Sequence, residues 1–187
     1  MGIPSTTERR LKRGRTAPRR SLGRISDPLP SELRLVPLDI GGYDEFWSLF
    51  QQAMPANADE VVAGLGIDPE EYERLPRETG ELRQIRCGGD TTGYVWLEVR
   101  GRELHVHALL LRPEYRGRGL AGRLLELLVT MYREEVDVVE LGVEPGNIAA
   151  RTVYERAGFE YVGERLGFLV MRRRLRGDQA NAERAAP

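Results

Sequence analysis

The chain of 187 residues has little cysteine and little histidine, with one Cys, Cys87, and two His. A single cysteine cannot close an intrachain disulfide, which excludes a secreted scaffold held together by disulfides. A structural zinc site usually needs four cysteine or histidine ligands, so we predict no metal site. No run approaches the roughly 18 consecutive apolar residues of a membrane-spanning helix, and we expect no membrane partner. With 41% hydrophobic and 30% charged residues, the composition is typical of a globular domain.

Lysine is almost absent, and the charge is unevenly distributed along the chain. Residues 1–28 hold eight basic and two acidic residues, a net charge of +6, whereas the rest holds 20 basic and 27 acidic residues, a net charge of −7. This pattern is typical of a disordered extension, a tail that binds nucleic acid or another anion, or an organelle transit peptide. We predict a disordered basic arm over 1–28 and a second disordered tail over 176–187.

No secretory signal is recognisable, because the arginines of the arm are not followed by an apolar core of about seven or more residues. We therefore predict a cytoplasmic location.

The apolar spacing of residues 29–175 predicts one mixed α/β domain. Strands are expected over 32–38, 82–87, 93–99, 103–111, 136–143, 159–162 and 167–175. Helices are expected over 43–54, 57–73 (as one or two short helices), 119–133 and 148–157. The predicted fold is a central, mostly antiparallel, twisted sheet of about seven strands flanked by four helices.

The most informative segment is LLLRPEYRGRGLAG, residues 109–122. An apolar strand leads through Pro113 and a glycine-rich loop directly into a leucine-rich helix. A helix N-terminus presents unpaired N–H groups and a partial positive charge, and Gly117 and Gly119 let the backbone approach a bulky anion. The loop lacks the Gly-Lys-Ser/Thr ending of nucleotide hydrolases and the three-glycine spacing of dinucleotide-binding folds. By itself it predicts either a pyrophosphate cradle or a plain turn with solvated arginines.

Two motifs together resemble the GNAT superfamily of N-acetyltransferases. The first is the loop RGRGLA, residues 116–121, preceded by PEY; the second is an Asn followed seven residues later by a Tyr, here Asn147 and Tyr154. The resemblance implies the GNAT fold with acetyl-CoA as co-substrate. It implies that backbone groups of Leu109, Leu110 and Leu111 pair with the pantetheine arm. It also implies that the pyrophosphate is held by Arg116, Gly117, Arg118, Gly119, Leu120, Ala121 and Gly122.

Asn147 and Tyr154 are about two helical turns apart, so their side chains share one helix face. The carboxamide suits the pantetheine amides. A phenol, with a reference pKa near 10, can protonate or hydrogen-bond a departing thiolate. The alternatives are that Asn147 only caps a helix and that Tyr154 is a core aromatic.

The general base is the least defined part of the predicted site. Many relatives that act on peptides carry a Glu five residues before the Asn, but this chain has Gly142 there. Other relatives carry a Glu on the preceding strand, at the position of His105, and a histidine suits proton transfer at neutral pH. His107 and Glu103 are expected on the same face, and Glu140 and Glu144 are further candidates. A purely structural pair of histidines stays open.

We therefore predict an N-acetyltransferase that moves an acetyl group from acetyl-CoA to a primary amine, of a small molecule or a peptide, by direct attack in a ternary complex. Tyr154 and His105 are the predicted catalytic residues. The alternative is a non-catalytic acyl-CoA sensor whose basic arm contacts nucleic acid, a partner not expected for the enzyme.

The acceptor and the oligomeric state are less defined. The net charge of −7 on residues 29–187, which we call the body, mildly favours a cationic amine as the acceptor. Tyr43, Phe46, Trp47 and Tyr72 are interpreted as core rather than pocket residues. The resemblance also implies that a homodimer through the C-terminal strands is common.

Overall fold

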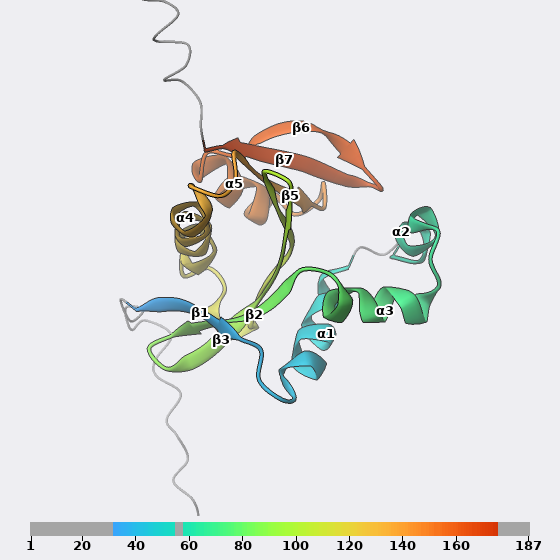
Figure 1. Cartoon of the computed structure of the whole chain (residues 1–187), viewed down its shortest axis with the longest axis horizontal. Coiled ribbons are helices and arrows are strands. Elements are labelled where there is room, and N and C mark those ends of the chain that lie inside the picture. Colours follow the sequence, from blue (N-terminus) through green and yellow to red (C-terminus); the bar gives the residue numbers. More distant parts are fainter. Residues whose placement is uncertain (1–31, 55–57, 176–187) are drawn as a thin grey trace, which may run out of the picture.

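The computed structural model describes residues 32–54 and 58–175, and within these ranges the chain forms one mixed sheet with five α-helices (Figure 1). The strands are β1 (Leu33–Pro37), β2 (Glu81–Cys87), β3 (Asp90–Arg100), β4 (Glu103–Leu111), β5 (Val138–Val143), β6 (Glu160–Arg165) and β7 (Phe168–Arg174). The helices are α1 (Gly42–Ala53), α2 (Ala58–Leu65), α3 (Pro69–Glu78), α4 (Leu120–Tyr132) and α5 (Ile148–Arg156), with a 3₁₀ turn at Pro113–Tyr115. The predicted arm, 1–28, and tail, 176–187, lie outside the described residues.

The strand order is β1-β2-β3-β4-β5-β7-β6, and of these neighbouring pairs β4–β5 is parallel and the others are antiparallel. The mostly antiparallel sheet is thus confirmed. The parallel pairing is short, because it joins 103–106 of β4 to 138–141 of β5. β4 nevertheless continues to Leu111, paired with β3 on its other side. The two central strands therefore part beyond Val106, and this parting opens the sheet.

A β-bulge in β4 lies at His107. Trp96 of β3 is paired with Ala108 and Leu97 with Val106, which leaves His107 as the extra residue. Such a bulge interrupts the alternation of side chains along a strand. Before the bulge Leu104 and Val106 join one core, whereas beyond it Ala108 and Leu110 join the other.

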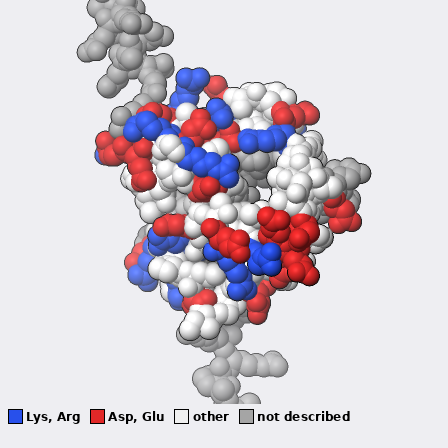
Figure 2. All heavy atoms as spheres, turned by 45° about the vertical axis from the view of Figure 1, so that its right-hand side comes forward, with Lys and Arg blue, Asp and Glu red and all other residues white. Residues whose placement is uncertain are grey.

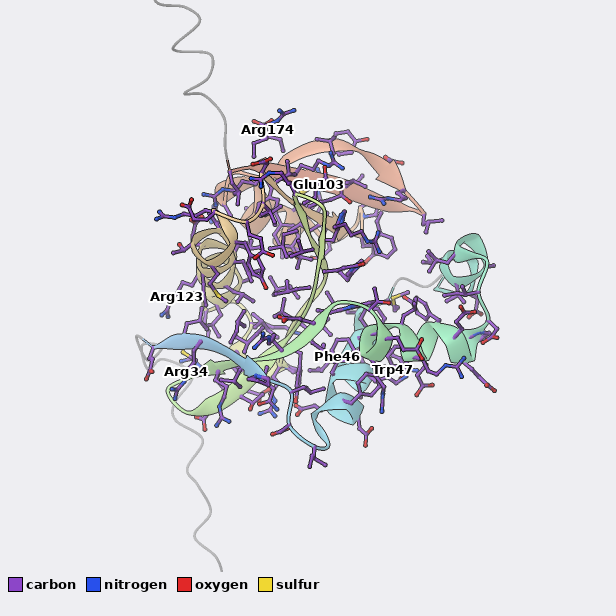
Figure 3. The ribbon with its side chains drawn as sticks, viewed as in Figure 1. Arg34, Phe46, Trp47, Glu103, Arg123 and Arg174 are labelled. Atoms are coloured by element: carbon purple, nitrogen blue, oxygen red, sulfur yellow. The ribbon has the colours of Figure 1, made fainter. Side chains whose placement is uncertain are left out.

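Helices cover both faces of the sheet (Figure 1), and each face has its own core. α4 and α5 pack on one face over a mainly aliphatic cluster, while α1 packs on the other over an aromatic one. Figure 3 shows Phe46 and Trp47 on α1, far from Glu103 on β4. Tyr43 and Phe46 are buried and Trp47 packs against their cluster, which confirms these three as core. Tyr72 packs against the same cluster but also lines a cavity, so its interpretation as core alone was wrong.

The region predicted as one or two helices over 57–73 forms two, so the described chain has five helices rather than the four predicted. Gly66, with φ 72°, follows the end of α2, and Asp68 caps α3 by accepting from the N–H of Glu71 at 2.7 Å. α3 runs to Glu78, further than predicted, because the buried Pro76 removes one N–H only near the helix end. No described helix is both long and apolar enough to cross a membrane.

Candidate active site

A cavity of about 410 Å³ lies where β4 and β5 part. Both strands line it, and α5 contributes to the same wall. Five of the predicted site residues line it, namely His105, Leu109, Leu110, Asn147 and Tyr154. Leu111 and the loop 116–122 are not part of this lining, and they continue the chain from the end of β4 toward α4. The structure therefore brings residues of β4 and α5 together around one opening in the sheet.

The glycine-rich loop has the backbone shape expected of a cradle. Gly117 and Gly119 have φ of 70° and 76°, in the left-handed region that favours glycine, and a Cβ added at either would meet nothing within 4 Å. α4 begins after Gly119 without a side-chain cap and without an acidic residue in its first turn. The backbone N–H of Arg123 donates to the Gly119 carbonyl at 3.2 Å and closes the first turn of the helix. The N–H groups of residues 120–122 come before this turn and therefore have no acceptor within the helix. This helix end is chemically suited to an anion.

The two arginines of the loop have protein contacts of their own. Arg116 Nε donates to the Leu111 carbonyl at 2.9 Å, which ties the loop to the last residue of β4. The Arg118 guanidinium lies 5.9 Å from the centre of the Tyr115 ring. Both arginines keep the loop positively charged, and Arg116 also holds its shape.

Asn147 and Tyr154 belong to α5, as their spacing predicted. The Oδ1 atom of Asn147 accepts from the Ala150 N–H at 3.1 Å, so the residue does cap the helix, and it lines the cavity as well. The cap occupies the oxygen and not the amide nitrogen. Tyr154 is partly buried against Phe159, with ring centres 6.2 Å apart. Burial raises the pKa of Tyr154 to about 12, so its phenol is protonated at neutral pH.

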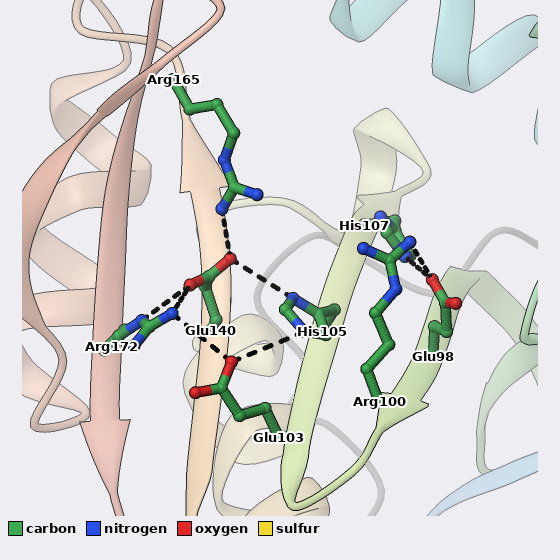
Figure 4. A network of polar contacts seen from close by, with 8 residues as sticks. All are labelled: Glu98, Arg100, Glu103, His105, His107, Glu140, Arg165 and Arg172. Carbon is green, nitrogen blue, oxygen red and sulfur yellow. Dashed lines mark hydrogen bonds and ion pairs between the residues drawn. The ribbon is translucent and has the colours of Figure 1, made fainter. Parts of the chain in front are cut away.

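His105 lies between two carboxylates (Figure 4). Its side chain is 13% exposed, with Nδ1 3.3 Å from Glu140 Oε1 and Nε2 3.7 Å from Glu103 Oε2. Glu140 is itself only 6% exposed and accepts hydrogen bonds from Arg165 at 2.5 Å and from Arg172 at 2.7 Å. Burial pushes the pKa of Glu140 upward, but the bonds from Arg172 and Arg165 together outweigh it, and the pKa is lowered. Both ring nitrogens of His105 thus lie near a carboxylate oxygen.

His107 shares this side of the sheet, as predicted, with its ring centre 6.1 Å from that of His105. Its ring centre lies 4.4 Å from that of Trp96, with the two ring planes tilted by 32°. Its Nε2 lies 2.7 Å from Glu98 Oε2, to which Arg100 also donates at 2.7 Å. Burial lowers the pKa of His107, against the opposing effect of Glu98. Of the described residues, no group of His, Cys, Asp and Glu could hold a metal ion. The two histidines therefore differ, because His107 packs against Trp96 and contacts Glu98, whereas His105 faces two carboxylates.

The family model for the acetyltransferase (GNAT) family matches residues 43–159. The chain belongs to the GNAT family. Its relatives include the N-alpha-acetyltransferase RimI of Mycobacterium tuberculosis, 39% identical over 84 residues, which are 43% of this chain and 52% of that protein. The mycothiol acetyltransferase of Clavibacter michiganensis is 36% identical over 134 residues, 71% of this chain and 44% of that protein. The chain spans about half the length of these curated relatives.

Solved GNAT structures share the fold. The ribosomal-protein-S18-alanine N-acetyltransferase of Escherichia coli superposes with a TM-score of 0.59 at 18% identity, over 80% of this chain and 98% of that one. A GNAT acetyltransferase of Elizabethkingia anophelis with acetyl-CoA bound gives a TM-score of 0.53 at 13% identity, over 77% and 99% of the two chains. At these identities the likeness confirms the predicted GNAT fold and no more.

The sequence analysis missed some of the charged residues around this cavity. Arg165 and Arg172 were not predicted to be site residues, and Glu140 was only one of several alternatives. A signal was present, since Glu140 interrupts an apolar strand and a buried carboxylate needs cationic partners. The partner could not be named, because Arg172 is paired with Glu140 only through the β5–β7 register.

Proposed function

We propose that the chain is an N-acetyltransferase that transfers the acetyl group of acetyl-CoA to a primary amine by direct attack within a ternary complex. The observation that carries this proposal is the parting of β4 and β5, with His105 and Tyr154 on the walls of the same cavity. Family membership supports the reaction type, and a GNAT neighbour with acetyl-CoA bound supports the co-substrate.

The donor half of the cleft comprises Leu109 to Leu111, the loop 116–122, Asn147 and Tyr154, and it suits acetyl-CoA. Beyond Val106 the β5-facing edge of β4 has no β5 partner, so its backbone groups can bond an extended amide chain such as pantetheine. The left-handed glycines and the start of α4 suit the pyrophosphate. When bound there, acetyl-CoA would supply an acetyl group activated as a thioester.

His105 is proposed as the general base and Tyr154 as the general acid. Nε2 of His105 takes the proton that the attacking amine loses as its nitrogen bonds to the acetyl carbon. Glu140 and Glu103, on either side of the ring, stabilise the positive charge that the imidazole gains. Tyr154 donates its proton to the sulfur as the carbon–sulfur bond breaks. The products are an amide and free CoA.

The alternative of an acyl-CoA sensor that contacts nucleic acid depends on residues 1–28, which lie outside the described residues. The cytoplasmic location and the homodimer also stay predictions from the sequence.

The proposal is tested by following free thiol and acetylated product together, with acetyl-CoA and a panel of primary amines. We expect thiol and acetyl amide to form in equal amounts with at least one amine, at a rate that depends on both substrates. Thiol released without amide, or no turnover with any amine despite bound acetyl-CoA, would contradict transfer.

A further inference from the structure

The acceptor side of the cavity is lined mainly by apolar and aromatic side chains from two separate parts of the chain. Helices α1–α3 and the β6–β7 hairpin supply them, and we call the following residues the acceptor half: Phe50, Val61, Leu65, Tyr72, Leu166 and Phe168. A cavity of this size, walled by hydrophobic side chains with a few polar groups, is typical of a small-molecule site.

The two parts meet over the cavity. A Cβ added at Gly64 of α2 would lie 2.7 Å from Leu166 Cδ2, so the helix backbone and the tip of the hairpin are in contact. Leu166 has φ 51°, a left-handed conformation that costs a non-glycine residue about 1–2 kcal/mol. In Figure 1 this end of the hairpin points toward α2. The contact bridges one side of the acceptor half, although Leu65 and Leu166 remain 44% and 37% exposed. The bridge favours a compact substrate over an extended one.

Aromatic rings connect the acceptor half to the histidines. Tyr72 packs on Phe50 at 6.1 Å, Phe50 on Trp96 at 6.3 Å, and Trp96 on His107 at 4.4 Å between ring centres. The Tyr72 hydroxyl contacts Met54 Sδ at 3.5 Å, and burial raises the pKa of Tyr72 to about 12, so the ring stays neutral. This row of rings offers an aromatic group edge-to-face or stacked contacts beside the predicted base.

The charges near the base do not favour a substrate with several positive charges. Glu140 is paired with Arg165 and Arg172, and Glu98 is paired with Arg100. Figure 2 shows acidic side chains gathered where α2 and α3 come forward, but no charged residue of these two helices is part of the cavity lining. The remaining lining carboxylate, Glu144, is exposed at the end of β5, on the side of Asn147. The net charge of the body, which favoured a cationic acceptor, is thus largely neutralised at the site.

From these contacts we infer that the acceptor is a small primary amine joined to one aromatic or bulky apolar group, with no second positive charge. This inference rests on the proposed acetyl transfer, since it names the acceptor of the same site. The ring or apolar group occupies the acceptor half, and the amine nitrogen reaches His105.

The test compares kcat/KM for 2-phenylethylamine, spermidine and an alanyl tetrapeptide at saturating acetyl-CoA. We expect 2-phenylethylamine to be preferred by at least about tenfold, the range that apolar pocket contacts supply. Leu166→Asp places a charge in the acceptor half at a backbone conformation that Asp tolerates better than Leu. It should lower kcat/KM for 2-phenylethylamine about tenfold through KM, with the affinity for acetyl-CoA within about twofold.

The matched control is Val162→Asp on β6 of the same hairpin, because Val162 is 54% exposed and not part of the cavity lining. Its kinetics should stay those of the unchanged protein. Suppose that acetyl-CoA raises the melting temperature. If spermidine or the tetrapeptide is then the preferred acceptor, or if none of the three amines is acetylated, the inferred acceptor is wrong while acetyl-CoA binding stands. If acetyl-CoA does not bind at all, the proposed function fails and the inference falls with it.

Discussion

The donor half of the cleft is built mainly from backbone, whereas the acceptor half is built from side chains. In the donor half the important features are the unpaired edge of β4, the left-handed glycines of the loop and the start of α4. In the acceptor half they are rings and aliphatic groups from α1–α3 and the β6–β7 hairpin. A backbone site keeps its ligand while side chains vary, but a side-chain site changes its ligand with each substitution. The comparison teaches that the proposed co-substrate depends on backbone features, whereas the proposed acceptor depends on this chain's own side chains.

The largest effect on turnover is expected at Tyr154, which is proposed to donate a proton to the thioester sulfur of acetyl-CoA, where the two halves meet. Tyr154→Phe removes the proposed proton donor and keeps the ring packed on Phe159, so kcat should fall about 100-fold or more with little change in acetyl-CoA affinity. Steady-state kinetics and a binding titration measure the two effects separately. Tyr161→Phe, on β6 and 58% exposed, is the control and should be silent. Equal turnover in the Tyr154 variant would remove that residue from the mechanism.

A backbone change should weaken the donor half alone. Gly119→Val forces a β-branched residue into φ 76° and adds methyl groups to the loop, so acetyl-CoA should bind about tenfold or more weakly. Gly101→Val is the matched control, since Gly101 also has a left-handed φ, 60°, with open space around it, at the opposite end of β4. Both variants should lose similar stability, and only the first should lose affinity. An equal loss of affinity in both would place the binding elsewhere.

Glu140 is expected to act through His105 as a positioning residue. Glu140→Gln keeps the volume and removes the charge 3.3 Å from Nδ1, so kcat should fall about tenfold. The variant also leaves Arg165 and Arg172 without the carboxylate that they share. An unchanged kcat, with a normal melting temperature, would contradict a role for Glu140 in catalysis.

The smallest effect is expected on the pH dependence of stability, at the contact between the first turn of α1 and the residue that follows β4. Glu45 of α1 accepts from Arg112 at 2.5 Å and from the Tyr94 hydroxyl at 2.6 Å, and the Arg112 bond in particular lowers its pKa. A lowered carboxyl pKa contributes stability that is present above the unfolded value, near 4.3, and is lost as the pH falls through the folded value. Glu45→Gln should therefore flatten the loss of melting temperature below about pH 5.

The control for this prediction is Asp44→Asn in the same first turn of α1, at an exposed position. Thermal melts from neutral to acid pH compare the two variants. An identical slope in both would mean that the Glu45–Arg112 pair contributes no pH-dependent stability.

The local geometry of the proposed donor half could be predicted from the sequence because its signals are local. The loop RGRGLA and the pair Asn147 and Tyr154 each lie within one turn or helix, where spacing alone fixes geometry. Most strands and helices could likewise be predicted from local spacing. The exception is α3, which continues past the predicted end through Pro76, a residue that is buried in the fold.

The acceptor half could not be predicted because its contacts join distant parts of the chain. Gly64 meets Leu166 and Glu140 meets Arg172 only after the sheet has set its register. The bulge at His107 is a further example, since only the pairing of β3 with β4 reveals it. The sequence named His105 by counting along one strand, but its two carboxylate neighbours came from the structure.

The most direct test of the account is a thermal melt with acetyl-CoA, with free CoA and ATP measured beside it. A ligand at about 100 times its dissociation constant stabilises the folded state by about 2.7 kcal/mol, which for a chain of this size raises the melting temperature by about 5–10 °C. We predict this rise with acetyl-CoA and with CoA, and no rise with ATP. No shift at millimolar acetyl-CoA would contradict the central claim that the parted strands and the glycine loop form its binding site.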